Sequence, residues 1–255
     1  MTETGTRPLA LLSNDDGYTS RGIRAMRDAL ATFADVIVVA PETEQSASSH
    51  SLTLHRPMRL RAVEEGIFAI DGTPADCVYV ALHSGRILDR APDIVVSGLN
   101  HGMNLGQDVF YSGTVAAARE GALRGIPALA TSVHPKCDFA AAAAMCAKIA
   151  AALVGTRPPN VRVAPLLNVN VPKDFNGLRA TRLGARIYEE LIDFRKDPRG
   201  REYFWLGGPG VRHEPDAGSD TEAYDEGVAS ITPLRLDLTE PSYIDLVTAL
   251  VAATK

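Results

Sequence analysis

The sequence predicts an α/β protein built on an open, mainly parallel β-sheet. Two observations predict it: short continuous apolar runs, which are typical of strands buried on both faces, and helical spacing of apolar residues between those runs. The N-terminal part shows both, because an apolar run at 8–13 is followed by a helical pattern at 22–33 and a second apolar run at 35–40. Strands and helices that alternate in this way form βαβ units with right-handed crossovers.

The alternation continues to about residue 172. We predict further strands and helices, with strands at 93–97, 126–132 and 166–171 and helices at 74–83, 112–124 and 139–154. A looser alternation predicts short strands at 52–54, 58–63 and 67–70. Thr73 is suited to cap a helix that begins at Pro74, because threonine is a favoured N-cap residue. Proline is favoured in the first helical position.

The residues after 180 predict a different organisation. Aromatic and apolar residues lie on both sides of the turn sequence at 197–200, and this pattern predicts a β-hairpin over 186–206. A polar stretch at 207–227 follows, and its acidic part is expected to be a solvated loop. A short strand at 229–232 and a helix at 242–253 close the chain. We therefore predict two parts, which are an α/β core at 1–180 and a smaller region at 181–255 whose aromatic hairpin is suited to self-association.

Composition excludes several classes of protein. The chain has 255 residues and a formal net charge of -5, without the basic face expected of a protein that binds nucleic-acid polymers. The three cysteines, Cys77, Cys137 and Cys146, are widely spaced, which argues against a disulfide framework or a structural zinc site. The N-terminal residues have no apolar signal region, and no apolar run reaches the roughly 18 residues of a membrane span. We therefore expect a cytoplasmic protein that binds no membrane.

Polar loops follow several of the predicted strands. In an open parallel sheet, ligands bind beyond the carboxyl ends of the strands, where the strand order reverses. The strands at 8–13, 35–40 and 93–97 lead into polar loops at 14–17, 45–51 and 98–106. We expect these loops to converge and form one site.

Asp15 and Asp16 are adjacent carboxylates at the end of the first predicted strand. Crowded into a crevice, they repel each other and lose hydration, and a hard divalent cation removes this penalty. Ser46 and Asn100 supply a hydroxyl and an amide oxygen, which would complete an oxygen-only set of ligands typical of magnesium. The alternative is that 14–17 is an ordinary tight turn, because such tetrapeptides are common in turns.

A second candidate group, Ser112, Gly113 and Thr114, precedes an alanine-rich predicted helix. Free backbone N–H groups at a helix N-terminus bind anions, a glycine permits close approach, and hydroxyl groups add donors. Simple N-capping by serine or threonine accounts for the same residues. The glycine-spaced loop at 98–106, which contains Asn104, is irregular enough to bring backbone near a ligand, but it lacks the spacing of a dinucleotide-binding loop.

Other catalytic classes find little support. The six histidines form no pattern of a zinc hydrolase or deaminase, and no Gly-x-Ser-x-Gly sequence occurs. His50 and His101 are candidates to line the pocket, although a single histidine more often has a surface or packing role. Cys77 lies in a predicted helix and is expected to pack in the core.

Several motifs follow one another along nearly the whole chain. They are Asn14-Asp15-Asp16-Gly17, Gln45-Ser46 with Ser51-Leu52-Thr53, Gly72-Thr73-Pro74-Ala75-Asp76-Cys77-Val78, the glycine-spaced loop from Ser97 to Gly106, Tyr111-Ser112-Gly113-Thr114-Val115-Ala116-Ala117, and Ser230-Ile231-Thr232-Pro233-Leu234. In this order they resemble the SurE family of stationary-phase survival proteins, which are 5′/3′-nucleotidases.

The resemblance implies a Rossmann-like three-layer core, with a smaller C-terminal part through which subunits form homodimers or homotetramers. It implies hydrolysis of nucleoside 5′- and 3′-monophosphates and, in some members, of short polyphosphate. The family's metal ligands fall on Asp15, Asp16, Ser46 and Asn100, which implies one Mg²⁺ or Mn²⁺ per subunit with Asp15 and Asp16 as catalytic residues. The implied substrate contacts fall on Asn14, Asn104, Ser112, Gly113 and Thr114.

The sequence departs from the family pattern at two places. Ala47 stands where many members have glycine, which is expected to stiffen its loop, and Arg235 stands where many have a histidine at a subunit contact. Two other functions stay open: a nucleotide sensor that binds without turnover, and an interaction protein whose aromatic hairpin recruits a partner. The adjacent aspartates favour the enzyme over the sensor, since nucleotide binding alone has little use for them.

Overall fold

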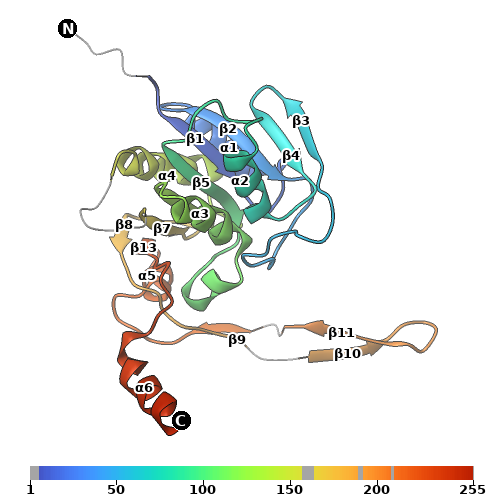
Figure 1. Cartoon of the computed structure of the whole chain (residues 1–255), viewed down its shortest axis with the longest axis vertical. Helices are drawn as coiled ribbons and strands as arrows, with labels where there is room; N and C mark the ends of the chain where they lie inside the picture. Colours follow the sequence, from blue (N-terminus) through green and yellow to red (C-terminus); the bar gives the residue numbers. More distant parts are fainter. Residues whose placement is uncertain (1–5, 157–163, 189–191, 208–209, 255) are drawn as a thin grey trace.

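The computed structural model describes residues 6–156, 164–188, 192–207 and 210–254. Within these residues the core is a nine-stranded sheet in the order β3-β4-β2-β1-β5-β6-β7-β13-β8 (Figure 1). The strands that run parallel to their neighbours through the centre are β4 (Ile67–Ile70), β2 (Asp35–Pro41), β1 (Leu9–Ser13), β5 (Ile94–His101), β6 (Ala128–Val133) and β7 (Leu166–Val171). This sheet confirms the predicted α/β class with a mainly parallel sheet.

Antiparallel pairing occurs toward both edges of the sheet. At one edge β3 (Leu60–Glu64) pairs antiparallel with β4. Toward the other edge β13 (Ala229–Pro233) pairs antiparallel with β7 and parallel with β8 (Leu178–Ala180). The strand predicted at 229–232 is therefore confirmed, and it belongs to the central sheet.

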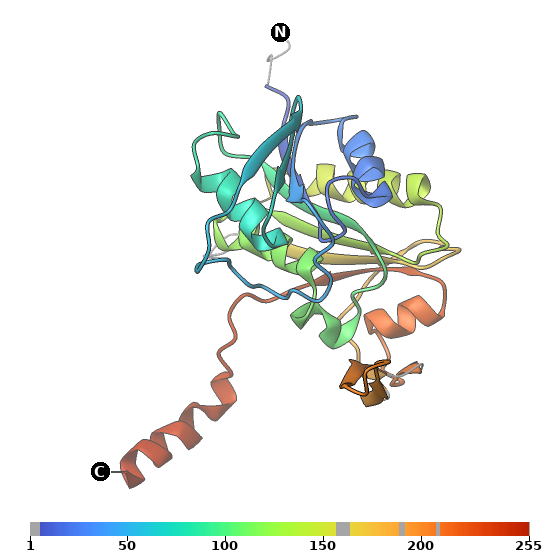
Figure 2. The ribbon, with the colours of Figure 1, turned by 90° about the vertical axis from the view of Figure 1, so that its right-hand side faces the viewer.

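Helices cover both faces of the sheet and make a three-layer core. One face carries α1 (Arg21–Leu30) and α4 (Phe139–Leu153), and the other carries α2 (Pro74–His83) and α3 (Gly113–Leu123) (Figure 2). Successive residues of β1 point to opposite faces, so Leu12 packs in the cluster with α1 and α4 while Leu11 packs in the cluster with α2 and α3. Burial on both faces explains the continuous apolar run of this strand.

The structure corrects two predictions about strands. Residues 52–54 form no strand; instead the backbone N and the hydroxyl of Thr53 donate to the buried carboxylate of Asp76, at 2.9 and 2.6 Å. The strand predicted at 93–97 continues to His101 as β5, because Asn100 resumes pairing with β6 after an irregularity at Ser97. The predicted ligand Asn100 therefore lies at the end of a strand.

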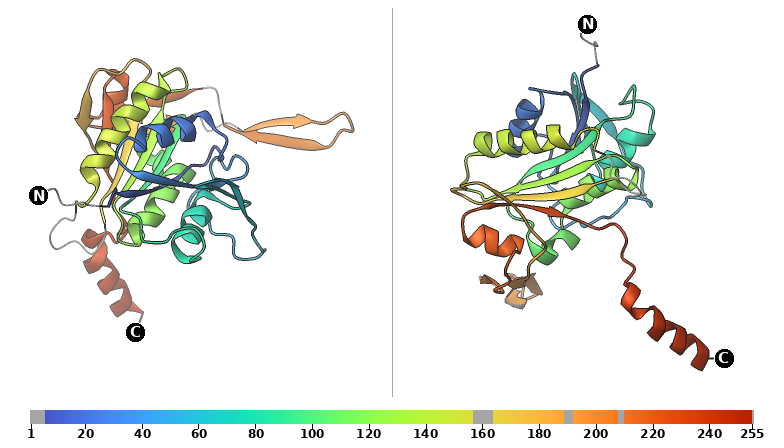
Figure 3. Two further views of the ribbon diagram at one scale, coloured as in Figure 1. Left: turned by 90° about the horizontal axis from the view of Figure 1, so that it is seen from above. Right: turned by 90° about the vertical axis from the view of Figure 1, so that its left-hand side faces the viewer.

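The C-terminal residues form a hairpin that is shorter than the one predicted over 186–206, because residues 186–188 pair with 211–213 instead, and two further pieces. β10 (Ile192–Lys196) and β11 (Glu202–Leu206) pair antiparallel and extend away from the body, as the left view of Figure 3 shows. At the base of this arm β9 (Arg186–Tyr188) pairs with β12 (Val211–His213). The helix predicted at 242–253 is present as a 3₁₀ turn at Pro241–Tyr243 followed by α6 (Ile244–Ala253), which stands clear of the sheet (Figure 2).

The acidic stretch after residue 213 is not the solvated loop that was predicted. It contains α5 (Asp220–Asp225), and the side chain of Asp220 is completely buried. Its carboxylate accepts hydrogen bonds from the backbone N of Gly106 at 3.0 Å and of Gly184 at 2.7 Å. The prediction failed because composition shows that a stretch is polar but not which distant backbone donors its carboxylates meet.

In the part of the chain that the structure describes, no helix combines the length and the apolar character needed to cross a membrane.

Candidate active site

The sheet order reverses beside β1. From β1 the chain continues to β2 and β4 on one side, and later crosses to β5, β6 and β7 on the other. The carboxyl ends of β1 and β5 therefore flank a crevice, which is where open α/β sheets bind ligands. A pocket of about 500 Å³ lies there, and its lining includes Asp15, Asp16, Ser46, Asn100, Asn104 and Ser112. The loops that were predicted to converge do so.

Asp15 is the more buried of the two adjacent acids, with 5% of its surface exposed. The pKa of its carboxyl is raised to about 6: burial is the largest cause and the nearby charge of Asp16 adds to it, while a hydrogen bond from the Thr114 hydroxyl opposes the shift. Burial also raises the pKa of Asp16, although its Oδ2 accepts a hydrogen bond of 3.1 Å from the backbone N of His101. Both anions are therefore held at a cost in free energy that a cation between them would remove.

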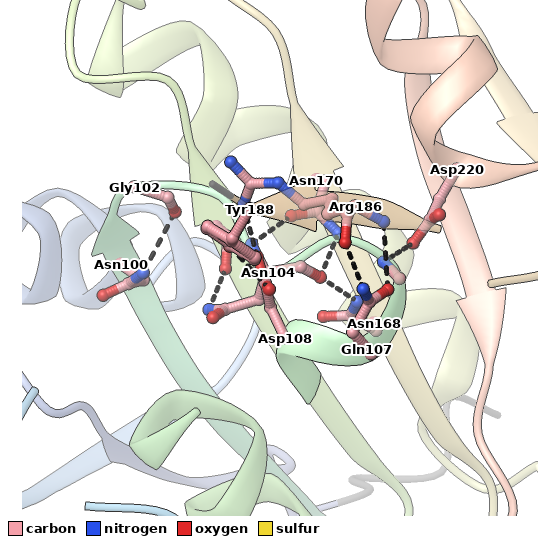
Figure 4. A network of polar contacts seen from close by, with 12 residues as sticks. Asn100, Gly102, Asn104, Gln107, Asp108, Asn168, Asn170, Arg186, Tyr188 and Asp220 are labelled. Carbon is pink, nitrogen blue, oxygen red and sulfur yellow. Dashed lines mark hydrogen bonds and ion pairs between the residues drawn. The ribbon is translucent and has the colours of Figure 1, made fainter. Parts of the chain in front are cut away.

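Asn100 and Ser46 line the same pocket. The Asn100 Nδ2 donates to the carbonyl of Gly102 at 3.0 Å, which leaves its Oδ1 available as a ligand (Figure 4). The Ser46 hydroxyl donates to Glu44 Oε1 at 2.7 Å and keeps its lone pairs free. Two carboxylates, an amide oxygen and a hydroxyl form an oxygen-only donor set that fits a hard divalent cation.

Among the described residues, no group of three or more histidine, cysteine, aspartate or glutamate side chains is arranged to hold a metal ion. A cation at the end of β1 would thus need neutral oxygen ligands besides Asp15 and Asp16, and Asn100 and Ser46 are in place to supply them.

The N-terminus of α3 reaches the same pocket. Ser112 caps this helix, since its hydroxyl accepts a hydrogen bond from the backbone N of Val115 at 3.0 Å, and it also lines the pocket. A Cβ on Gly113 would lie 2.8 Å from Ser48 Oγ and 2.9 Å from Asp15 Cβ, so only glycine lets the helix approach this closely. Capping and anion binding are compatible here, because the N–H groups of the first helical turn point toward the N-terminus of α3, which lies at the crevice.

Three of the predicted substrate residues lie behind the pocket wall. Thr114 and Gly113 pack against Asp15, and Asn14 is fully buried. The Asn14 Nδ2 donates to the carbonyl of Gly17 at 3.0 Å and to Ser20 Oγ at 2.9 Å, which holds the turn that presents the two aspartates. The structure thus places these three residues behind those that line the pocket, where they support Asp15 and the turn that carries it.

Asn104 lines the pocket and is held by a buried amide network at the ends of β6 and β7 (Figure 4). Its backbone N donates to Asn170 Oδ1 at 2.8 Å, and its Nδ2 donates to Ser132 Oγ at 2.8 Å. Its carbonyl accepts from the side chain of Asn168 at 2.8 Å. This network orders the glycine-spaced loop, which has few apolar side chains to pack.

The loop that carries Ser46 is tied to the 3₁₀ turn before α3 and to the last turn of α3. Ser49 donates from its hydroxyl to the carbonyl of Phe110 at 2.7 Å, and His50 Nε2 lies 2.9 Å from Oε2 of Glu120, which is 2% exposed. His50 therefore positions the loop and does not line the pocket, whereas His101 does line it. Ala47 has a φ of 56°, the left-handed conformation in which glycine is favoured.

Sequence reasoning missed a further group in the pocket lining: Asp108, Tyr111, Arg186 and Tyr188. Asp108 pairs with the guanidinium of Arg186, and the Tyr188 hydroxyl donates to Asp108 Oδ1 at 2.6 Å (Figure 4). These partners are 78 and 80 positions apart in the chain. The only signal in the sequence was the abundance of aromatic residues around the predicted hairpin.

The arrangement places oxygen atoms suited to a hard divalent cation next to the N-terminus of α3, whose free N–H groups are suited to an anion. A group with several negative oxygens, such as a phosphate, can be held between the two, with charge that develops on it stabilised from both sides.

The chain is similar to known proteins over most of its length. The family model described as "Survival protein SurE" matches residues 10–190. The chain is 60% identical over 240 residues to a protein of Sorangium cellulosum named 5′-nucleotidase SurE, covering 91% of each chain. It is 51% identical over 243 residues to a protein of Anaeromyxobacter dehalogenans with the same name, covering 92% of this chain and 93% of that one. The crystal structure of the SurE protein from Aquifex aeolicus matches with a TM-score of 0.81 and 37% identity, covering 95% of this chain and 99% of that chain. The chain therefore belongs to the SurE family.

Proposed function

We propose that this chain is a divalent-metal-dependent phosphatase that cleaves nucleoside 5′-monophosphates into nucleoside and phosphate. The observation that carries the proposal is the adjacent pair Asp15 and Asp16, whose pKa values are raised by burial, in a pocket that also receives the N-terminus of α3. The name shared by the similar proteins, 5′-nucleotidase SurE, supplies the substrate class.

In this proposal Asp15, Asp16, Ser46 and Asn100 hold one Mg²⁺ or Mn²⁺ per subunit. The bound ion supplies charge neutralisation and Lewis acidity at the phosphate. Asp15 and Asp16 are the catalytic residues, because they set the charge and position of the reacting centre. Their orientation is fixed by the Thr114 hydroxyl and by the backbone N of His101.

The phosphate oxygens that the cation does not contact are assigned to the helix N-terminus. The Ser112 hydroxyl proton and the first-turn N–H groups of Gly113 and Thr114 are the donors we assign to them. Asn104, which is held at the end of β7, is assigned to a contact with the substrate. Asn14 is assigned to holding the turn that carries Asp15 and Asp16. We extend the proposal to nucleoside 3′-monophosphates and short polyphosphate, which a substrate panel tests.

The experiment is phosphate release from AMP by the purified protein in the presence of manganese. We expect release that stops on addition of EDTA and that is lost in Asp16→Asn. Asp28→Asn on the exposed face of α1 is the matched control, and it should keep full activity. Binding of AMP without release of phosphate would replace this proposal with the nucleotide sensor.

We also propose that the chain forms a homodimer or homotetramer through the region at 181–255, with the core at 1–180 as the catalytic part. Support comes from large apolar side chains that the single chain leaves in solvent, on the arm and on α6: Phe194 is 66% exposed, Trp205 63% and Leu250 58%. Sizing chromatography with light scattering tests this, and a monomer would contradict it. The free thiols of Cys77, Cys137 and Cys146 support a reducing, cytoplasmic location.

A further inference from the structure

Beyond the proposed cation and phosphate groups, the pocket has a second polar wall made by Asp108, Arg186 and Tyr188, which we call the arginine cluster. Arg186 and Tyr188 come from β9, and Asp108 comes from the 3₁₀ turn at Gly106–Phe110. All three line the same pocket as Asp15 and Asp16. A ligand whose phosphate lies at the aspartates can therefore extend toward this cluster.

The arginine cluster is electrically balanced. The Arg186 guanidinium pairs with the Asp108 carboxylate, and the two side chains are only 16% and 12% exposed. Tyr188 adds a hydroxyl that donates to the same carboxylate at 2.6 Å, and its ring lies 5.3 Å from the guanidinium carbon. A guanidinium already neutralised by a carboxylate is poorly suited to hold a phosphate dianion. It suits a neutral polar ligand, to which it presents further N–H donors.

The cluster is built into the fold. The backbone N of Arg186 donates to Gln107 Oε1 at 3.0 Å, and the Gln107 side-chain amide donates back to the carbonyl of Arg186. Next to them, buried Asp220 accepts from the backbone N of both Gly106 and Gly184. A Cβ on Gly106 would lie 2.5 Å from the carbonyl of Gly184, so the two segments are in close contact.

Two features of the cluster point to a ligand. The Arg186 side chain is 16% exposed and lines the pocket, so part of its guanidinium is accessible to a ligand there, although its Nε is buried and has no hydrogen-bond partner among the described residues. Two aromatic rings of the pocket lining are accessible as well, since Tyr188 is 44% exposed and Tyr111 is 66% exposed. Exposed rings beside balanced polar donors are the elements that recognise a base and a ribose.

We propose that the arginine cluster, with Tyr111, holds the nucleoside part of the substrate: the Tyr188 and Tyr111 rings stack on the base, and Arg186 donates to neutral oxygens of the nucleoside. This proposal rests on the proposed function, because it assigns residues to the nucleoside part of the substrate whose phosphate lies in the same pocket. Asp108 is a positioning residue that keeps Arg186 and Tyr188 together.

The test separates the two products of the reaction, because adenosine occupies only the nucleoside end and inorganic phosphate occupies only the other. Inhibition of AMP hydrolysis by each product is measured for Tyr188→Ala. We expect the inhibition constant for adenosine to rise about tenfold, since loss of one stacked ring weakens binding by about that factor. The constant for phosphate should stay within about twofold. Tyr79→Ala on α2 is the matched control, because Tyr79 is 41% exposed and does not line the pocket.

Calorimetric titration of nucleosides into the protein in EDTA gives a readout that needs neither metal nor turnover. Binding by the wild-type protein that is weakened in Tyr188→Ala, and retained in Tyr188→Phe, supports the proposal even if no phosphatase activity is found. Equal losses for adenosine and phosphate in Tyr188→Ala would mean that the cluster only supports the shape of the site and would overturn the proposal. So would a wild-type protein that binds none of the common nucleosides at millimolar concentration.

Discussion

The Thr114 hydroxyl donates a hydrogen bond to Asp15 Oδ1 and so joins the first turn of α3 to the carboxyl end of β1, across 99 positions of the chain. Thr114 is completely buried, and Asp15 is nearly so. The helix that we assign to the phosphate and the acid that we assign to the cation therefore move as one unit. This contact makes the position of Asp15 relative to the N-terminus of α3 independent of the flexibility of the surface loops.

Asp15→Asn is expected to remove nearly all activity and to stabilise the metal-free protein. The amide cannot supply the negative charge for the cation, so the loss in kcat/KM should exceed the roughly 10- to 100-fold that loss of an outer-shell partner costs. The fold should persist, because the amide oxygen still accepts the Thr114 hydrogen bond. Circular dichroism and phosphate-release kinetics check both statements, and a variant with normal turnover contradicts the assignment.

The pH dependence of stability should differ between wild-type protein and Asp15→Asn in EDTA. The Asp15 pKa is raised to about 6 in the folded state from 3.8. Between these values the folded state binds the extra proton, so this group lowers the stability of the folded state as the pH rises through the window. The stability gained by Asp15→Asn should grow from near zero at about pH 4 to at most about 3 kcal/mol above pH 6. Urea unfolding at several pH values measures it, and a pH-independent difference contradicts it.

Thr114→Val is expected to weaken metal binding most at low pH. The substitution keeps the shape of the side chain but removes the hydrogen bond that lowers the Asp15 pKa, so the carboxyl holds its proton to a higher pH. The half-saturating Mn²⁺ concentration should rise by about tenfold near pH 6.5 and by less near pH 8.5. Thr114→Ser keeps the hydroxyl and is the control. An equal effect of Thr114→Val at both pH values would argue against this cause.

Ala47→Gly is expected to leave the protein as stable as the wild type or to stabilise it by up to about 1 kcal/mol. The left-handed conformation of Ala47 costs about 1 kcal/mol, and glycine removes this cost. The relief offsets the greater conformational entropy that glycine gives the unfolded chain. Ala62→Gly in the exposed strand β3 has no such strain to relieve and should destabilise by about 0.5–1 kcal/mol. Chemical unfolding of both variants measures the difference, and equal destabilisation would show that the Ala47 conformation costs nothing.

His50→Gln is expected to raise the half-saturating Mn²⁺ concentration by about tenfold, because it loosens the loop that carries Ser46. Arg124→Gln is the matched control, since Arg124 donates to the same Glu120 carboxylate at 2.7 Å but is the C-cap residue of α3 and does not belong to the loop. It should lower thermal stability and leave the metal dependence unchanged. Metal titration by calorimetry checks the comparison, and parallel shifts in both variants would exclude a positioning role for His50.

Elements with local signals were predicted well. The helix predicted at 74–83 has those bounds in the structure, because Thr73 accepts from the backbone N of Asp76 and the Asp76 carboxylate accepts from the backbone N of Thr73. Pro74 supports the start of the helix from the next position along the chain. All the information for this helix start lies within four consecutive residues. The predicted strand at 52–54 failed for the opposite reason, since Thr53 is held by an acid 23 positions away.

The sequence alone determined the family and the chemistry expected at the end of the first strand, because Asp15 and Asp16 are adjacent and follow a run of residues buried on both faces. Only the tertiary structure decided that Arg186 and Tyr188 share a pocket with them, and that Asp220 is buried. The physical reason is the range of the interactions. Caps, turns and buried runs depend on neighbours in the chain, whereas a contact across about 80 positions depends on the path by which the whole chain returns to the sheet.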